Sequence, residues 1–189
     1  YNKQKRTFEA LSELIQETAD EIRYLESVSN SLDIALSEAD LGQIKEELTA
    51  SGYVRRKFTK KKVKLTNKPM HYISSDGYDI YVGKNNIQND ELTFSFANGG
   101  DWWFHAKGAP GSHVIVKTNG DELPDRTFEE AGRLAAYYSK NRGSDKVEID
   151  YIEKKHVKKP NGAKPGFVVY YTNYSLVIDS DISNIKVVQ

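Results

Sequence analysis

Residues 101–117 read DWWFHAKGAPGSHVIVK, two apolar runs joined by a turn that contains Gly and Pro. Successive side chains alternate between the two faces of a β-strand, so Trp102 and Phe104 share one face, which we expect to be the core. The Gly108–Gly111 turn returns the chain to a second run that begins near His113. Turn residues between two such runs predict a β-hairpin.

Period-two alternation continues on both sides of this hairpin, and it is typical of half-buried strands. Strands are predicted at residues 78–82, 92–96, 102–105, 113–117, 147–152, 167–172, 176–178 and 185–188. One main helix interrupts them. Residues 127–130 (TFEE) can cap it, Gly143 ends it, and its apolar stripe contains Ala131, Leu134, Ala135 and Tyr138. Strands around one main helix predict an α+β fold with a mostly antiparallel sheet.

Residues 7–36 contain no Gly or Pro and carry a heptad pattern. Its seam consists of Phe8, Leu11, Ile15, Thr18, Ile22, Leu25, Ser29, Leu32 and Leu36. One coiled-coil seam cannot bury itself, so we expect a partner helix upstream in a longer chain or on another copy. An amphipathic helix packed on the following domain is the alternative. Ser37–Asp40 resembles a capping box that begins a short helix, and Gly52 suits its end.

The formal net charge of zero conceals a separation of the two signs. Residues 1–50 hold 11 acidic and 5 basic side chains, whereas residues 51–189 hold 16 acidic and 22 basic ones. Such a separation indicates different partners for the two halves. We therefore divide the chain into a coiled-coil arm with a short helix (1–52), a basic linker (53–71) and an α+β domain (72–189).

The chain contains no Cys, which excludes a disulfide scaffold, a thiolate metal site and a cysteine nucleophile. No apolar run approaches the roughly 18 residues that a membrane span needs, and no signal peptide is visible. The chain begins at Tyr1 without Met, and we expect it to be part of a longer protein.

Two basic clusters favour contact with nucleic acid. The first contains Arg55, Arg56, Lys57, Lys60, Lys61, Lys62, Lys64 and Lys68, and the second contains Lys154, Lys155, His156, Lys158, Lys159 and Lys164. Phosphate backbones bind such patches through counterion release. The alternative is that these charges form only a solvated linker and surface.

The predicted hairpin places Asp101, Trp103 and His105 on one face, with Ser112 and His113 beyond the turn. Aromatic and imidazole rings can stack on unpaired bases, and the polar groups can bond base edges or phosphate. Three other interpretations remain: a metal site formed by Asp101, His105 and His113, a Ser-His-Asp hydrolase that uses Ser112, and a purely structural hairpin.

Two further polar segments are candidates for contact. Residues 83–90 (GKNNIQND) suit a turn between strands, or a hydrogen-bonding loop at the rim of a site. Residues 138–142 (YSKNR) place cations at the end of the predicted helix, where they favour the helix dipole and are also able to contact phosphate.

Several motifs together resemble the NFACT-R domain of the NFACT family, which includes bacterial FbpA and RqcH proteins and eukaryotic NEMF. They are VGKNNIQNDELT (82–93), DWWFHAKGAPGSHVIVK (101–117), AAYYSKNRGSDKVEIDY (135–151) and KKPNGAKPGFVVYY (158–171). The preceding helices resemble the returning arm of the family's middle coiled coil.

This resemblance implies a cytoplasmic factor of ribosome-associated quality control. Such a factor binds an obstructed large ribosomal subunit and recruits tRNA, in bacteria alanyl-tRNA, for C-terminal tailing without mRNA. The peptide-bond chemistry belongs to the ribosome, so we expect no enzymatic activity and no cofactor. The family's older name motivates an alternative, a surface adhesin that binds fibronectin or fibrinogen, with a cell-surface fraction.

From the residues and the resemblance together we select candidates for RNA contact. They are Arg55, Arg56, Lys60, Lys61, Lys62, Asp101, Trp103, His105, Lys107, Ser112, His113, Lys140, Arg142 and Lys155. The family's Asp-x-Trp-x-His, Pro-Gly-Ser-His and Tyr-Ser-Lys-x-Arg patterns fall on members of this set.

Overall fold

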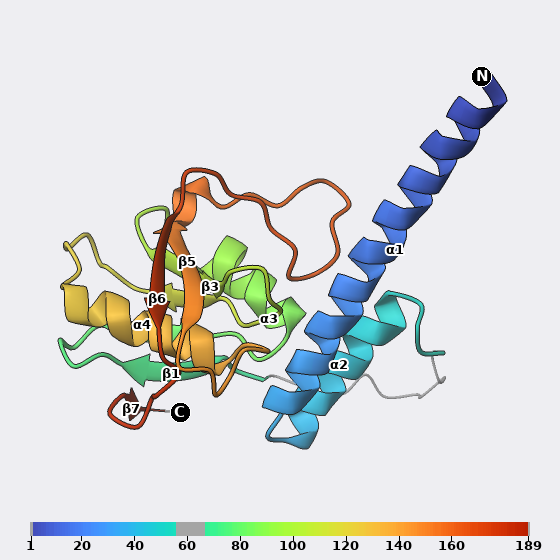
Figure 1. Cartoon of the computed structure of the whole chain (residues 1–189). Coiled ribbons are helices and arrows are strands. Elements are labelled where there is room, and N and C mark those ends of the chain that lie inside the picture. The colour runs from blue at the N-terminus through green and yellow to red at the C-terminus, as the bar shows by residue number, and fades with distance from the viewer. Residues whose placement is uncertain (1, 56–66, 189) are drawn as a thin grey trace.

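The computed structural model describes residues 2–55 and 67–188, and it confirms the predicted α+β class (Figure 1). Helix α1 (Asn2–Ile34) is a long rod whose N-terminal half extends beyond the rest of the molecule. Helix α2 (Glu38–Ala50) turns back along it and completes a helical arm. The arm lies beside a domain built on one seven-stranded sheet.

Every strand pair of this sheet is antiparallel, as predicted. The strands are β1 (Met70–Ile73), β2 (Asp79–Val82), β3 (Trp102–Ala106), β4 (Val114–Val116), β5 (Val147–Glu153), β6 (Tyr174–Ile178) and β7 (Lys186–Val187). Their order is β6-β5-β3-β4-β2-β1-β7. The predicted hairpin is therefore confirmed as β3 and β4, and it lies at the centre of the sheet.

Helix α4 (Asp125–Tyr137) covers one face of the sheet (Figure 1). Its apolar stripe, including Leu134 and Ala135, packs on Phe104 and Val114 in the larger core cluster. Phe104 is fully buried, as expected, while Trp102 is partly buried against Phe128. Burial of these aliphatic and aromatic side chains is the main stabilising contribution on this face.

The opposite face is covered by irregular structure rather than by a long helix. Helix α3 (Asn86–Glu91), the π-turn η1 (Leu92–Phe96) and the 3₁₀ turn η2 (Lys154–His156) lie there. The second core cluster contains Leu92, Ala97, Trp103, Ile115, Ile152 and Val157. The central strands are therefore buried on both faces.

The turn predicted between strands at residues 83–90 and the strand predicted at 92–96 are wrong, because residues 86–96 are helical. Asn85 caps α3 by accepting a hydrogen bond from the Gln88 N–H at 2.9 Å, which begins a helix. The Ala97 N–H then reaches the Leu92 carbonyl at 2.9 Å, the i to i+5 bond of a π-turn. Leu92 and Phe96 are separated by one turn, so helical geometry also places them on the same side.

Residues 167–172 do not form the predicted strand. A single bridge pairs Val169 with Lys158, and Thr172 has a φ of 57°, outside the β region. The cap assigned to α4 is also wrong, because the helix begins at Asp125 and ends at Tyr137. The Thr127 hydroxyl instead bonds Ser74 and Asp76, which ties α4 to the β1–β2 turn.

The arm keeps its heptad seam exposed. Phe8, Ile15 and Ile22 are 72%, 69% and 54% exposed, whereas a different side of α1, carrying Tyr24 and Val28, packs against α2. The predicted capping box is confirmed: the Ser37 hydroxyl accepts a hydrogen bond from the Asp40 N–H. Within the described ranges, no helix is both long enough and apolar enough to cross a membrane.

Candidate nucleic-acid interface

Asp101 lies at the start of β3 and is almost completely buried. Its carboxylate accepts hydrogen bonds from the Asn98 and Thr118 N–H groups at 2.7 and 3.1 Å, and from Lys117 Nζ at 2.5 Å. A buried carboxylate is stabilised by such a set of donors. Asp101 therefore joins the entry of β3 to the end of β4, and all of its acceptor positions face the protein.

Trp103 does not offer an open face for base stacking, which corrects the expectation from the sequence. It is fully buried in the second core cluster. Its ring lies 5.6 Å from His105, 5.1 Å from His113 and 4.9 Å from Tyr170, between centroids. This face of β3 was expected to be open to a ligand, because Trp103 alternates with the core residues. It is instead covered by α3, η1 and the segment after η2.

The two histidines of the hairpin lie side by side, with ring centroids 5.5 Å apart; His113 is buried and His105 is partly buried. Burial lowers the pKa of His105 to about 4. Burial and the neighbouring His105 lower the pKa of His113 well below its usual value. His113 Nδ1 lies 2.8 Å from the Thr93 hydroxyl. Both rings are neutral at pH 7, so they add no positive charge to the surface.

The metal and hydrolase interpretations find no supporting geometry. Asp101 lies at the opposite end of β3 from His105 and is bound to Lys117. No group of three His, Cys, Asp or Glu side chains converges anywhere in residues 2–55 and 67–188. The Ser112 hydroxyl is buried and has no hydrogen-bond partner among the described residues, so no base activates it.

The structure does bring two of the predicted motifs together. The Ser112 N–H donates to the Tyr138 carbonyl and the Lys140 N–H to the Pro110 carbonyl, both at 2.9 Å. The turn at 110–112 is thus held against the end of α4. Lys140 pairs with Glu26 of the arm at 2.6 Å, and the Arg142 guanidinium lies 3.7 Å from the Tyr137 ring centroid.

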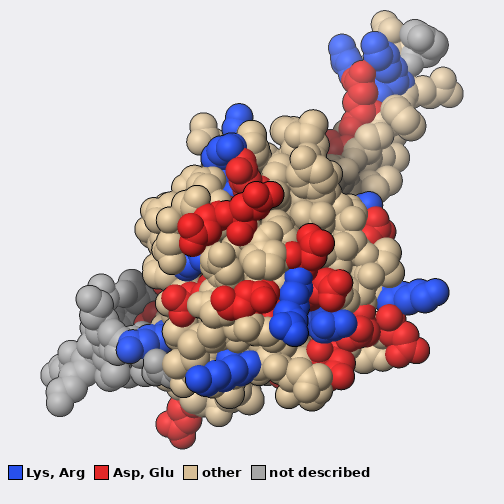
Figure 2. Space-filling view, turned by 90° about the vertical axis from the view of Figure 1, so that its left-hand side faces the viewer, with Lys and Arg blue, Asp and Glu red and all other residues tan. Residues whose placement is uncertain are grey.

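The remaining candidate cations are spread over the surface. Lys107 and Lys155 are exposed and pair with Glu148 and Glu153, and Arg55 is exposed at the end of the arm. Arg56, Lys60, Lys61 and Lys62 lie outside the described residues. On the face shown in Figure 2, acidic and basic side chains are interspersed and form no continuous basic patch.

Sequence reasoning missed the polar contact between the arm and the domain. The Asn86 and Asn85 amides donate to Glu47 and Gln43 of α2, each at 2.8 Å. Burial raises the pKa of Glu47, and its second carboxylate oxygen has no hydrogen-bond partner within the described part of the chain. The Asn-rich run 85–89 was visible in the sequence, but its role depends on α2, which lies about 40 positions earlier.

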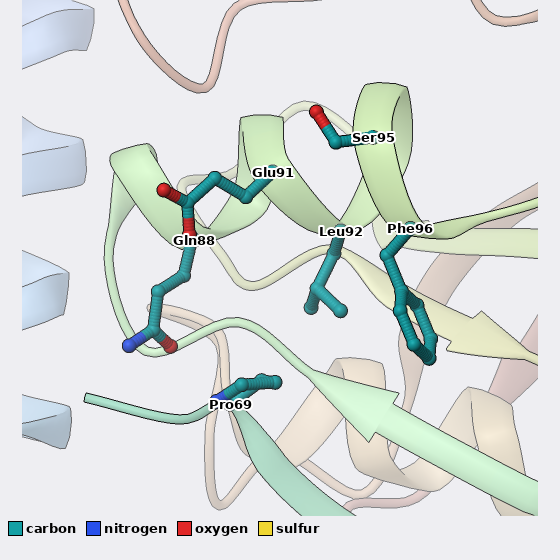
Figure 3. A pocket seen from close by; sticks show the side chains of 6 residues that line it. All are labelled: Pro69, Gln88, Glu91, Leu92, Ser95 and Phe96. Atoms are coloured by element: carbon teal, nitrogen blue, oxygen red, sulfur yellow. The ribbon is translucent and has the colours of Figure 1, made fainter. Parts of the chain in front are cut away.

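A hollow of about 440 Å³ was also missed. It lies between η1 and the beginning of β1, and its lining consists of Pro69, Gln88, Glu91, Leu92, Ser95 and Phe96 (Figure 3). Phe96 is 43% exposed there. The sequence offered Phe96 only as a strand residue, so no pattern marked it as part of a site.

Comparison with known proteins assigns the two parts of the chain. Residues 68–172 match the family model described as the NFACT protein RNA binding domain, and residues 1–67 match the model of the NFACT N-terminal and middle domains. The Rqc2 homolog RqcH of Streptococcus suis is 46% identical over 98% of this chain and 33% of its own length. The Bacillus subtilis protein of the same name is 40% identical over 98% and 32%.

More distant and structural relatives agree with this assignment. The human ribosome quality control complex subunit NEMF is 37% identical over 42% of this chain and 7% of its own length. The structure of the C-terminal part of the fibronectin/fibrinogen-binding protein from Streptococcus suis superimposes with a TM-score of 0.89 at 44% identity, covering 98% of this chain and 75% of that one. The chain spans about a third of the length of its bacterial relatives. On this evidence the chain belongs to the NFACT family, and residues 68–172 are its RNA-binding domain.

Proposed function

We propose that this chain is the RNA-binding C-terminal part of a ribosome quality control factor. In the whole protein it would bind obstructed large ribosomal subunits and tRNA, and support alanine tailing of stalled nascent chains. The observation that carries the proposal is the match of residues 68–172 to an RNA-binding family domain, within a likeness to RqcH proteins over nearly the whole chain. Cytoplasmic, ribosome-associated localisation follows from the same proposal.

The structure suggests a binding and positioning role rather than catalysis. Asp101, Trp103, Ser112 and His113, which looked most reactive in the sequence, are buried and hold the fold. Lys107, Lys140 and Lys155 pair with partly exposed carboxylates, and such pairs are weak enough to exchange for phosphate. The proposed contact with RNA therefore rests on exposed lysines and arginines, without Trp103.

The test measures RNA affinity as a function of salt. One variant of the 189-residue chain carries Gln at Arg55, Arg56, Lys60, Lys61 and Lys62. The control carries Gln at the five basic residues of the arm, Lys3, Lys5, Arg6, Arg23 and Lys45. We expect the first variant to bind tRNA more weakly, with a log–log salt slope reduced by roughly 0.7–0.9 per lost phosphate contact. The control should retain most of the wild-type slope.

Equal slopes in the two variants and the wild type would remove the basic segment from the interface. Absence of salt-dependent RNA binding in the wild-type chain would contradict the RNA-binding proposal itself. Cosedimentation of the full-length parent with obstructed large subunits, followed by sequencing of the bound tRNA, tests the ribosomal part. Recovery only with fibronectin or fibrinogen at the cell surface would favour the adhesin instead.

A further inference from the structure

The hollow beside η1 has an apolar floor and an accessible aromatic side. Leu92 and Phe96 emerge from the same side of the helical segment and point toward Pro69 (Figure 3). Its volume of about 440 Å³ lies within the range of about 300–1,000 Å³ that is common for small-ligand sites. A ring that is nearly half exposed within such a space can receive a flat ligand group.

Phe96 is the outermost member of a row of rings across the sheet. His71 on β1 and Tyr81 on β2 are cross-strand partners, and their rings stack with centroids 4.5 Å apart and planes 2° apart. The Tyr81 ring meets Phe96 edge-on at 4.7 Å. His71 is held by Asp79 at 2.6 Å. This packing fixes the Phe96 ring before any ligand arrives, which reduces the entropic cost of binding.

Cations border the same segment. Lys117 Nζ lies 4.9 Å from the Phe96 ring centroid and 3.5 Å from the Phe96 carbonyl oxygen. Lys154 Nζ lies 5.8 Å from the Phe94 ring centroid. Lys117 is itself largely buried, with a side chain that is 14% exposed, and its ammonium pairs with the buried Asp101. The accessible cation beside this segment is therefore Lys154, which is partly exposed.

We propose that this hollow binds one unpaired nucleobase of single-stranded RNA, stacked on Phe96, with an adjoining phosphate beside Lys154. The inference rests on the proposed RNA-binding function and adds the place and the chemistry of one contact. A stacking ring beside cations is the combination that single-stranded nucleic acids favour. The contacting residues all lie within the stretch that matches the RNA-binding family model.

Glu91 at the rim adds a preference among bases. It is exposed and forms no ion pair with any residue in the described ranges. A carboxylate repels phosphate but accepts a hydrogen bond from an exocyclic amino group, such as that of cytosine. The hollow should therefore favour cytosine over uracil, which lacks this donor.

Fluorescence anisotropy with short oligocytidylate, oligouridylate and a fully paired RNA duplex tests the inference on the 189-residue chain. Phe96→Leu keeps apolar volume but removes the aromatic face, whereas Phe96→Tyr keeps the face. The expected result is about a tenfold loss of oligocytidylate affinity in Phe96→Leu, with little change in Phe96→Tyr. The salt slope and the duplex affinity should stay at the wild-type values, because no phosphate contact is removed.

Two controls make the result specific. Tyr171→Leu removes a 73%-exposed ring outside the hollow and should leave affinity within about twofold of wild type. Glu91→Gln should reduce the preference for oligocytidylate over oligouridylate. Thermal melts followed by circular dichroism verify that each variant is folded.

If folded Phe96→Leu bound oligocytidylate with wild-type affinity and kept its salt dependence, the inference would be overturned. The proposed function would be unaffected by that result. If Phe96→Leu weakened binding to intact large subunits but not to oligonucleotides, the hollow would be assigned to contact with a ribosomal protein. That outcome would also overturn the inference. If the wild-type chain binds no RNA, the proposed function fails first and the inference fails with it.

Discussion

Burial decides the chemistry of the hairpin residues. Trp103, His105 and His113 were selected as RNA contacts because their side chains suit stacking and hydrogen bonding. In the folded domain Trp103 instead stacks on His105, meets His113 edge-on and packs against the tilted ring of Tyr170. Substituting Trp103 by Ala would therefore test core packing, at a cost of about 3–5 kcal/mol, before it tested any contact with RNA.

The lowered pKa values of His105 and His113 predict a loss of stability in mild acid. The folded pKa of His105, about 4, lies below the unfolded value near 6.5, so the unfolded chain binds more protons between these limits. Stability is then fully present above the unfolded value and decreases as pH falls from about 6.5 toward 4. Between pH 7 and pH 5, His105 alone should lower the free energy of unfolding by about 2 kcal/mol.

Urea denaturation at the two pH values measures this effect. His105→Gln should flatten the pH dependence, while His156→Gln, at an exposed side chain, should leave it unchanged. A wild-type protein that is equally stable at pH 7 and pH 5 would show that the rings are hydrated and protonate freely in the folded state.

At the scale of the element, helix α1 presents two different apolar surfaces. One surface packs on α2 through Tyr24 and Val28, and the other is the exposed heptad seam. The buried stripe fixes α1 against α2, and the exposed stripe is suited to pack against a further helix. A partner helix for the exposed seam stays a prediction.

Substitution of the two surfaces should give opposite results. Ile15→Gln, at a 69%-exposed seam position, should change the free energy of unfolding by less than about 0.5 kcal/mol. Val28→Ala, at a 5%-exposed position against α2, should lower it by about 1–2 kcal/mol. Denaturant unfolding of the 189-residue chain compares them. A large, concentration-dependent cost of Ile15→Gln would instead indicate that two copies already share the seam.

At the scale of the whole molecule, polar contacts hold the arm against the domain. Lys84 of the domain bonds Asp40 of α2 at 2.8 Å, where both side chains are largely buried. Although burial opposes the shift, hydrogen bonds from Lys84 and Asn67 hold the pKa of Asp40 below its usual range. Lys140 and Glu26 form a second link, but these side chains are 56% and 40% exposed.

The two lysines should differ sharply in their effect on stability. Lys84→Met leaves Asp40 buried without its cation and should lower the free energy of unfolding by about 3 kcal/mol. Lys140→Met breaks an exposed pair and should cost less than about 1 kcal/mol. Thermal and urea unfolding at pH 7 provide the comparison. Equal costs would mean that the Asp40 site is hydrated, and that the arm is held mainly by apolar contacts.

Local patterns in the sequence determined much of this architecture. Period-two alternation located the central hairpin and most strands, the heptads located α1, and Ser37 with Asp40 located the start of α2. These features depend on neighbours within a few residues, so a linear pattern records them. The motif resemblance led to the family on the same basis.

Only the tertiary structure decided which of the candidate side chains are accessible to a ligand. Residues 92–96 alternate like a strand, yet the Asn85 cap and the cover over Trp103 make them a π-turn that leaves Phe96 at the surface. Asp101 and His113 resemble site residues in sequence, but contacts that form only in the folded domain bury them. Burial arises from contacts between distant segments, and a sequence pattern carries no record of which segment will cover a given face.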